Sequence, residues 1–159
     1  NREKRRLDAK AASEGPGNIA RGKTAMIRGI RVLDDRGEEV DRYRPGMGLV
    51  VEVKWETVDP DADLHLGVAI ERGDGMRIFG VATFLEGMPA LSGAGERRAR
   101  LRVDDLPIAK GNYSVTAYLF DKSGLHIWDQ AMLTDRLRPE SDDWAPALLQ
   151  LEHSWEFES

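Results

Sequence analysis

Alternation of apolar and polar residues constrains the fold of this chain more than any other feature. Apolar side chains occupy nearly every second position in five stretches, 49–55, 64–70, 99–103, 113–119 and 149–157. A period of two is typical of strands that bury one face, and it differs from the roughly 3.6-residue period of a helix. Turn residues stand between the stretches in Asp35-Arg36-Gly37, Pro45-Gly46, Asp59-Pro60-Asp61, Gly73-Asp74-Gly75 and Lys122-Ser123-Gly124. The sequence therefore predicts an all-β fold, an antiparallel sandwich or barrel.

Composition limits the functions open to this fold. The 159 residues fit one domain, and 41% hydrophobic with 32% charged residues is ordinary for a globular protein. The formal charge of -5 offers no positive field to a polyphosphate backbone, so nucleic acid is not expected as a partner. The absence of cysteine excludes disulfides and thiolate metal sites and favours a reducing compartment, the cytoplasm. No apolar run approaches the roughly 20 residues of a membrane-spanning helix, so no direct membrane span is expected.

The first 21 residues differ from the rest of the chain. Residues 1–12 mix good helix formers without a broad apolar stripe, and residues 13–17 (SEGPG) break any helix. We expect residues 1–21 to be a linker, helical in its first part, and residues 22–159 to form the β domain. A chain that opens on Asn1 without a signal peptide is expected to be a piece of a longer protein.

One motif points to a different class of protein. Residues 17–24 (GNIARGKT) match the P-loop pattern, and residues 119–121 (LFD) imitate the apolar run that ends in a magnesium-binding Asp. A P-loop works because a buried strand delivers its glycines and a helix N-terminus holds the phosphates. Here the preceding residues break structure, and residues 27–33 are typical of a strand. We expect a coincidence, whereas an NTPase would lose nucleotide binding in Lys23→Ala.

The sequence predicts no metal site, no cofactor and no catalytic residue. Asp59, Asp61 and Asp63 imitate a calcium loop, but Leu64 stands where that loop requires glycine, so a solvated acidic turn is expected. The histidines at 65, 126 and 153 lack ligand-type spacing, and no nucleophile elbow is present. Two carboxylates brought together from distant strands would suit a glycosidase, and that alternative stays open.

A predicted hairpin gathers aromatic residues on one face. If residues 122–124 form a three-residue loop, Phe120 lies opposite His126 and Tyr118 lies opposite Trp128. All four side chains then share a face, while the other face carries the core residues of the hairpin. The aromatic face is left for solvent, for a covering segment or second subunit, or for a ligand.

Flat aromatic rings beside polar groups suit sugars, because the C–H faces of a sugar stack while its hydroxyls take hydrogen bonds. Asp129 and Gln130 are expected close to these rings as further polar groups. The candidate carbohydrate-binding residues are Tyr118, Trp128, His126, Phe120, Thr116 and His65. Structural cover over the same face is the competing interpretation.

Tyr113 allows two interpretations. It follows Leu106-Pro107 and Gly111 at the start of a strand, as does the tyrosine whose hydroxyl bonds back to the backbone in many sandwiches. It is equally compatible with an ordinary core aromatic.

The order of the features along the chain points to one family. The features are residues 30–34 (IRVLD) with Gly37, 43–46 (YRPG) before 49–53 (LVVEV), 67–70 (GVAI) with Asp74-Gly75, Phe79-Gly80 with Thr83, Leu106-Pro107 with Gly111 and Tyr113, and 153–155 (HSW). In this order the chain resembles the C-terminal carbohydrate-binding domain of Wzt-type ATP-binding subunits, found in ABC transporters that export bacterial O-antigen polysaccharide. The likeness extends from Thr24 to Phe157.

The resemblance implies an immunoglobulin-like sandwich in the cytoplasm, at the inner face of the membrane, that recognises the non-reducing end of a polysaccharide and catalyses nothing. It also implies a homodimer with exchanged terminal strands, for which residues 148–157 are the candidate, and a nucleotide-binding domain upstream of the linker. Ligand contacts vary within the family, so none is carried over. A structural domain that only dimerises or docks the transporter subunit is the alternative function.

Overall fold

The computed structural model describes residues 24–44, 46–108, 111–140, 151 and 153–158. Within these residues every regular element is a β-strand. The strands are β1 (Ala25–Leu33), β2 (Arg42–Tyr43), β3 (Leu49–Thr57), β4 (Asp63–Arg72), β5 (Arg77–Ala82), β6 (Leu91–Ser92), β7 (Gly95–Val103), β8 (Tyr113–Asp121) and β9 (Ile127–Pro139). Four of the predicted alternating stretches fall inside β3, β4, β7 and β8. The predicted linker, 1–21, lies outside the described residues.

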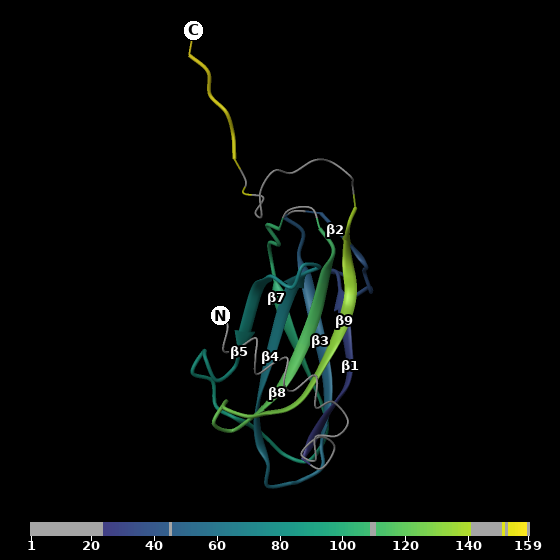
Figure 1. Ribbon diagram of the computed structural model, residues 1–159, viewed down its shortest axis with the longest axis vertical. Coiled ribbons are helices and arrows are strands. Elements are labelled where there is room, and N and C mark those ends of the chain that lie inside the picture. The colour runs from purple at the N-terminus through teal and green to yellow at the C-terminus, as the bar shows by residue number, and fades with distance from the viewer. Residues whose placement is uncertain (1–23, 45, 109–110, 141–150, 152, 159) are drawn as a thin grey trace.

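Two sheets face each other across a common core (Figure 1). The smaller sheet has the strand order β1-β3-β7 and is antiparallel throughout. The larger sheet follows the order β2-β9-β8-β4-β5, with β6 also paired to β4. Its pairs are antiparallel except for the short parallel pair of β2 with β9. The predicted all-β antiparallel sandwich is confirmed.

Alternation sorts the side chains of each strand between the core and an outer face. In β8, Val115, Ala117 and Leu119 are completely buried between the sheets. From the facing sheet, Val53 and Trp55 of β3 belong to the same core. Burial of one large apolar side chain stabilises the fold by about 1.5–3 kcal/mol, so these strands hold the two sheets together.

A tyrosine pair lies in the core near β2. The rings of Tyr43 and Tyr113 meet edge to face with centroids 5.5 Å apart. The Tyr43 hydroxyl donates a hydrogen bond of 2.9 Å to the carbonyl oxygen of Gly111. Burial raises the pKa of both hydroxyls, so both remain protonated at neutral pH. The Tyr43 hydroxyl thus binds the backbone of Gly111, two residues before Tyr113.

One buried carboxylate joins the two sheets along one side of the sandwich. Asp129 lies on the inner face of β9, opposite the core residue Leu119. Its Oδ2 accepts a hydrogen bond of 2.8 Å from the backbone N–H of Ile27 in β1. The expectation that Asp129 stands beside the aromatic face is wrong, because it points into the core and binds the other sheet.

A strand begins directly after the P-loop match. A phosphate-binding loop needs the N-terminus of a helix immediately behind its lysine, and residues 25–33 form β1 instead. Residues 17–23 lie outside the described residues. The position of β1 therefore contradicts the NTPase interpretation.

Candidate ligand-binding face

The outer face of the larger sheet carries most of the predicted site residues. Thr116, Tyr118 and Phe120 alternate with the core residues of β8, so they point away from the core. The register with β4 places His65 opposite Phe120 and Gly67 opposite Tyr118. Four of the six predicted residues therefore share one face. We define the aromatic face by His65, Glu71, Arg77, Phe84, Thr116, Tyr118 and Phe120.

Small residues let the aromatic rings lie flat across the sheet. A Cβ atom added to Gly67 would stand 2.7 Å from Cε2 of Phe120, so the ring occupies the space that a side chain there would need. Ala69 and Ala82 belong to the same cluster. The rings of Tyr118 and Phe120 are stacked, with centroids 5.8 Å apart and planes 24° from parallel. The result is a row of rings lying on the sheet.

Phe84 extends this row and was missed by sequence analysis. Its ring meets Phe120 edge to face at 5.1 Å and His65 at 5.8 Å. Nδ1 of His65 lies 2.9 Å from Oγ1 of Thr83, which also accepts the N–H of Leu66 at 3.0 Å. These contacts fix the orientation of the imidazole. Phe84 follows β5 in a turn, where period-two reasoning gives no guidance.

A charged pair borders the stacked rings. Nη2 of Arg77 donates to Oε1 of Glu71 at 2.9 Å and to the hydroxyl oxygen of Tyr118 at 2.8 Å. The guanidinium carbon also lies 5.7 Å from the centroid of the Tyr118 ring, within range of a cation–π interaction. Sequence analysis missed this pair as well. The signal was present, since a turn at 73–75 makes residues 71 and 77 cross-strand neighbours.

The aromatic face is closely packed. The exposed fraction is 0% for Thr116, 4% for Tyr118, 5% for His65 and 7% for Phe120. Oγ1 of Thr116 has no hydrogen-bond partner among the described residues. A buried hydroxyl without a partner costs about 1–3 kcal/mol. A polar ligand atom that reached Thr116 would remove that cost.

The hairpin between β8 and β9 differs from the predicted one. Oδ1 of Asp121 accepts the backbone N–H groups of Leu125 and His126, both at 3.1 Å. The Asp121 N–H donates to the carbonyl oxygen of His126 at 2.9 Å. These bonds lengthen the loop and pair Phe120 with Ile127. The predicted pairing of Phe120 with His126 is therefore wrong, and His126 is exposed in the loop.

A bulge beside this loop reverses the face of Trp128. The register shifts where β9 begins, so Trp128 is the extra residue of the bulge. Its half-buried ring packs against the core between the sheets. Gln130 takes the place opposite Tyr118. The predicted pairing of Trp128 with Tyr118 is wrong, because a shift of one residue moves a side chain to the other face.

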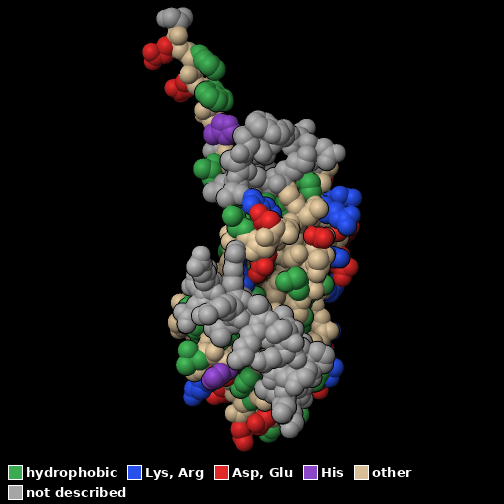
Figure 2. All heavy atoms as spheres, in the orientation of Figure 1, with side chains coloured by type: hydrophobic (Ala, Val, Ile, Leu, Met, Phe, Trp, Pro, Cys, Tyr) green, Lys and Arg blue, Asp and Glu red, His purple; other side chains and the backbone are tan. Residues whose placement is uncertain are grey.

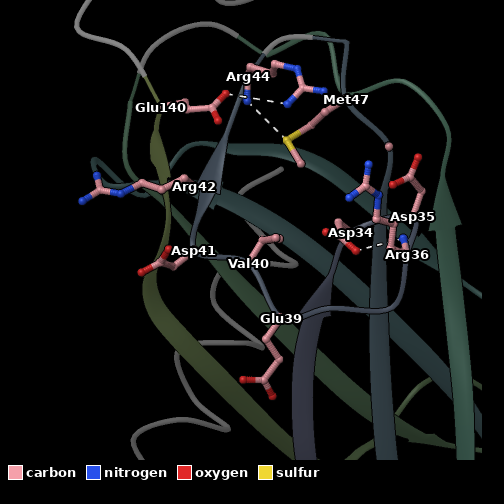
Figure 3. Close-up of a pocket in the computed structure, with 11 residues that line it drawn as sticks. Asp34, Asp35, Arg36, Glu39, Val40, Asp41, Arg42, Arg44, Met47 and Glu140 are labelled. Atoms are coloured by element: carbon pink, nitrogen blue, oxygen red, sulfur yellow. Dashed lines mark hydrogen bonds and ion pairs between the residues drawn. The ribbon is translucent and has the colours of Figure 1, made fainter.

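A polar cleft lies at the end of the sandwich where the β1–β2 connection meets the start of β3 (Figure 3). Its volume is about 500 Å³, and five carboxylates and three guanidinium groups line it. Nη1 of Arg44 lies 3.7 Å from Oε2 of Glu140. In Figure 3 the side chains of Asp41 and Arg42 point away from that of Asp35, so the charges do not converge on one point. None of the described lining residues is aromatic.

The described part of the chain holds neither a cluster of metal-ligating side chains nor a membrane-spanning helix. No group of three or more His, Cys, Asp or Glu side chains is arranged to hold a metal ion. No helix there is long and apolar enough to cross a membrane.

The fold defines a β-sandwich domain, and comparison with known proteins identifies its family. The family model of the Wzt C-terminal domain matches residues 21–135. A crystal structure of the C-terminal domain of Wzt aligns with a TM-score of 0.68 and 12% identity, covering 85% of this chain and 84% of that chain. Because the family model spans most of the sequence, the chain belongs to the Wzt C-terminal domain family.

More distant structures share the sandwich alone. A calcium-binding mutant of Bacteroides uniformis β-glucuronidase 2 aligns with a TM-score of 0.52 and 14% identity over 70% of this chain. Bacteroides uniformis β-glucuronidase gives a TM-score of 0.51 and 15% identity over 69%. The alignment spans 14% of the length of each enzyme. Among curated proteins no sequence match was found.

Proposed function

We propose that this domain is a non-catalytic module that recognises the non-reducing end of a bacterial surface polysaccharide of O-antigen type for export by an ABC transporter. Membership of the Wzt C-terminal domain family supports the association with a transporter. The observation that carries the ligand class is the stacked pair Tyr118 and Phe120, bordered by Arg77 and Glu71.

The chemistry of this face fits a sugar ring. Aromatic rings offer flat apolar area, and the neighbouring guanidinium and carboxylate offer donors and acceptors for hydroxyl groups. Because Tyr118 and Phe120 are only 4% and 7% exposed, a sugar would stack on them only after the atoms that cover them move aside. The hydrogen bond from Arg77 to Tyr118 holds the phenol in one orientation. The Tyr118 side chain therefore loses less conformational entropy when a ligand binds. Thr116 adds a buried hydroxyl that a ligand oxygen would satisfy.

Most of the predicted carbohydrate-binding residues remain in the proposed site. Tyr118, Phe120, Thr116 and His65 form the face, and the exposed His126 lies in the adjacent loop. Arg77 and Glu71 join them as polar contacts. Trp128 is left out because its ring packs with the core, and this makes it a matched control.

Titration of the 159-residue domain with the surface polysaccharide of its host tests the proposal. Tyr118→Ala should weaken binding by about 1–3 kcal/mol, the usual contribution of a stacked aromatic contact. Trp128→Ala should lower the unfolding temperature without changing the affinity of the folded protein. Equal affinity for wild type and Tyr118→Ala, or an equal loss in both variants, would remove the site from the aromatic face.

The exposed C-terminal segment supports a second proposal, dimerisation by strand exchange. Leu151, Trp155 and Phe157 are 66%, 76% and 87% exposed, and the rings of Trp155 and Phe157 stack at 6.0 Å. Figures 1 and 2 show residues 153–158 as an extended segment outside the sandwich, with apolar side chains along it. Apolar side chains on an extended segment favour pairing with a free sheet edge. We propose that residues 148–157 form a strand on a partner protomer.

Light scattering after size-exclusion chromatography tests the exchange. The wild-type domain should have the mass of a dimer, and a chain that ends at Glu140 should have the mass of a monomer with the same far-UV spectrum for the sandwich. A wild-type monomer at micromolar concentration would overturn the proposal.

A further inference from the structure

The outer face of the smaller sheet carries a row of arginines that the proposed function leaves unexplained. In β7, Ala99, Leu101 and Val103 pack against the core, so the alternating residues Arg98, Arg100 and Arg102 point outward. Strand β7 pairs antiparallel with β3, and Glu52 of β3 lies directly opposite Arg100. We define the arginine face by Arg31, Lys54, Arg98, Arg100 and Arg102 around Glu52.

Glu52 is the centre of this face and is buried, with 1% of its surface exposed. Nε of Arg100 donates to its Oε2 at 2.9 Å, Nη1 of Arg31 lies 3.5 Å from Oε1, and Nε of Arg98 lies 3.8 Å from Oε1. Burial would raise the pKa of Glu52, but the Arg100 hydrogen bond and the three positive charges outweigh it and lower the pKa. The carboxylate is therefore ionised at neutral pH.

One carboxylate cannot satisfy three guanidinium groups. A carboxylate offers roughly four acceptor positions, and three arginines carry about fifteen N–H donors. The side chains of Arg31, Arg98 and Arg100 are 46%, 50% and 57% exposed, so their remaining donors face solvent. The cluster is net positive in a chain whose formal charge is -5.

Carboxylates at the margin confine the positive charge to a narrow band. Glu39 binds Arg31 at one side, and Glu96 lies 3.3 Å from Lys54 near the start of β7. No ion pair with Arg102 is found in the described part of the chain. The positive band thus follows β7 along its length, rather than covering the face evenly.

The spacing of the arginines indicates the shape of a partner. Alternate residues of a strand lie about 6.6–6.8 Å apart, so Arg98, Arg100 and Arg102 form a straight row of cations at regular intervals. We infer that the arginine face binds an extended anionic polymer, a polysaccharide that carries carboxylate or phosphate groups on successive residues. A planar anionic bilayer fits less well, because it would also meet the marginal Glu39 and Glu96. The inference that the partner is an extended anionic polymer rests on the arginine face alone, and its identification as a polysaccharide rests on the proposed function.

The test uses oligogalacturonate as the probe and neutral dextran as its uncharged counterpart. Arg98→Gln with Arg102→Gln removes two cations but keeps the Arg100 bond to Glu52. The wild-type domain should bind oligogalacturonate and not dextran, and added salt should weaken binding. The double variant should bind about fivefold more weakly at low salt, as expected for two partly solvated charge contacts. Arg42→Gln with Arg44→Gln, in the polar cleft, is the control of equal charge and should bind like wild type.

Glu52→Gln separates binding from structural support. If Glu52 only braces the strands, its loss lowers stability and leaves probe binding unchanged; if the face binds anions, the loss of one negative charge strengthens binding. Equal binding by wild type and the Arg98/Arg102 variant, or equal loss in the polar-cleft control, would overturn the inference. Binding to vesicles containing phosphatidylglycerol, without binding to oligogalacturonate, would also overturn it in favour of lipid. These results are independent of the Tyr118 experiment, because that experiment tests binding of the non-reducing end of the polysaccharide to the aromatic face.

Discussion

The aromatic face and the arginine face are both outer faces of one sandwich, yet they differ in exposure. Tyr118 and Phe120 are almost completely buried, whereas the guanidinium side chains of Arg98 and Arg100 are half exposed. Gly67 leaves room for the Phe120 ring, and Ala69 and Ala82 pack in the same cluster as Tyr118 and Phe120. On the smaller sheet, long side chains cover the sheet with their stems and keep their charges in water. Alternation decides the side to which a residue points, and its neighbours decide whether it is buried.

The largest expected effect is that of Phe120→Ala. If the aromatic face is packed like a core, the loss of this ring should lower the free energy of unfolding by about 3–5 kcal/mol. Urea denaturation measures the change, with Leu125→Ala as the control because that side chain is 74% exposed. A loss below about 1 kcal/mol would mean that the face is no more packed than an ordinary surface.

Gly67→Ala tests whether the flat rings depend on the glycine beneath them. The added Cβ would stand 2.7 Å from the Phe120 ring, which must move. We expect a loss of about 1–3 kcal/mol in thermal unfolding, typical of an overpacked site. Gly29→Ala is the control, since no atom lies within 4 Å of the Cβ position there. Equal effects in the two variants would contradict the packing described for Phe120.

Tyr118→Phe has a smaller expected effect. It keeps the stacked ring and removes the oxygen that accepts the Arg77 hydrogen bond. The free energy of unfolding should fall by about 0.5–1.5 kcal/mol. Arg77→Lys with Tyr118→Phe completes a double-mutant cycle by chemical denaturation. Additive losses would show that the two side chains do not support each other.

The smallest expected effect belongs to the arginine face and depends on pH. The pKa of Glu52 is lowered from its ordinary value of 4.5, so its ionised form stabilises the native state above that pH. This contribution is lost as the pH falls through the lower, folded-state pKa. The difference in unfolding free energy between wild type and Glu52→Gln should therefore be constant near neutral pH and shrink below about pH 4.5. Glu96→Gln is the exposed control, and an identical pH dependence in both variants would contradict the role given to Glu52.

The strands that sequence analysis predicted are those with unbroken alternation, such as β3, β4 and β8. The length of β9 was not predicted, because Thr134, Asp135 and Arg136 interrupt its apolar pattern. Asp135 also takes a positive φ of 49°, which is uncommon for a residue other than glycine. The short strands β2 and β6 carry too few residues to show a period at all.

Sequence analysis predicted correctly which site residues of β4 and β8 share a face, but it placed the residues after the loop between β8 and β9 wrongly. Thr116, Tyr118, Phe120 and His65 share a face because alternation in β4 and β8 requires it. The position of Trp128 depended on the length of one turn, and that length is set by side-chain hydrogen bonds of Asp121. Period-two reasoning does not detect a bulge, and one extra residue exchanges the two faces of a strand.

The bond from Ile27 to Asp129 makes the two long sides of the sandwich unequal. Along one side β1 and β9 are fastened across the gap by a buried carboxylate, while β7 ends the smaller sheet on the other side. We therefore expect the two sheets to separate first on the side of β7, while β1 and β9 stay in contact. In hydrogen–deuterium exchange, the Ile27 amide should lose its protection only when the whole domain unfolds, whereas amides along β7 should exchange through smaller local openings.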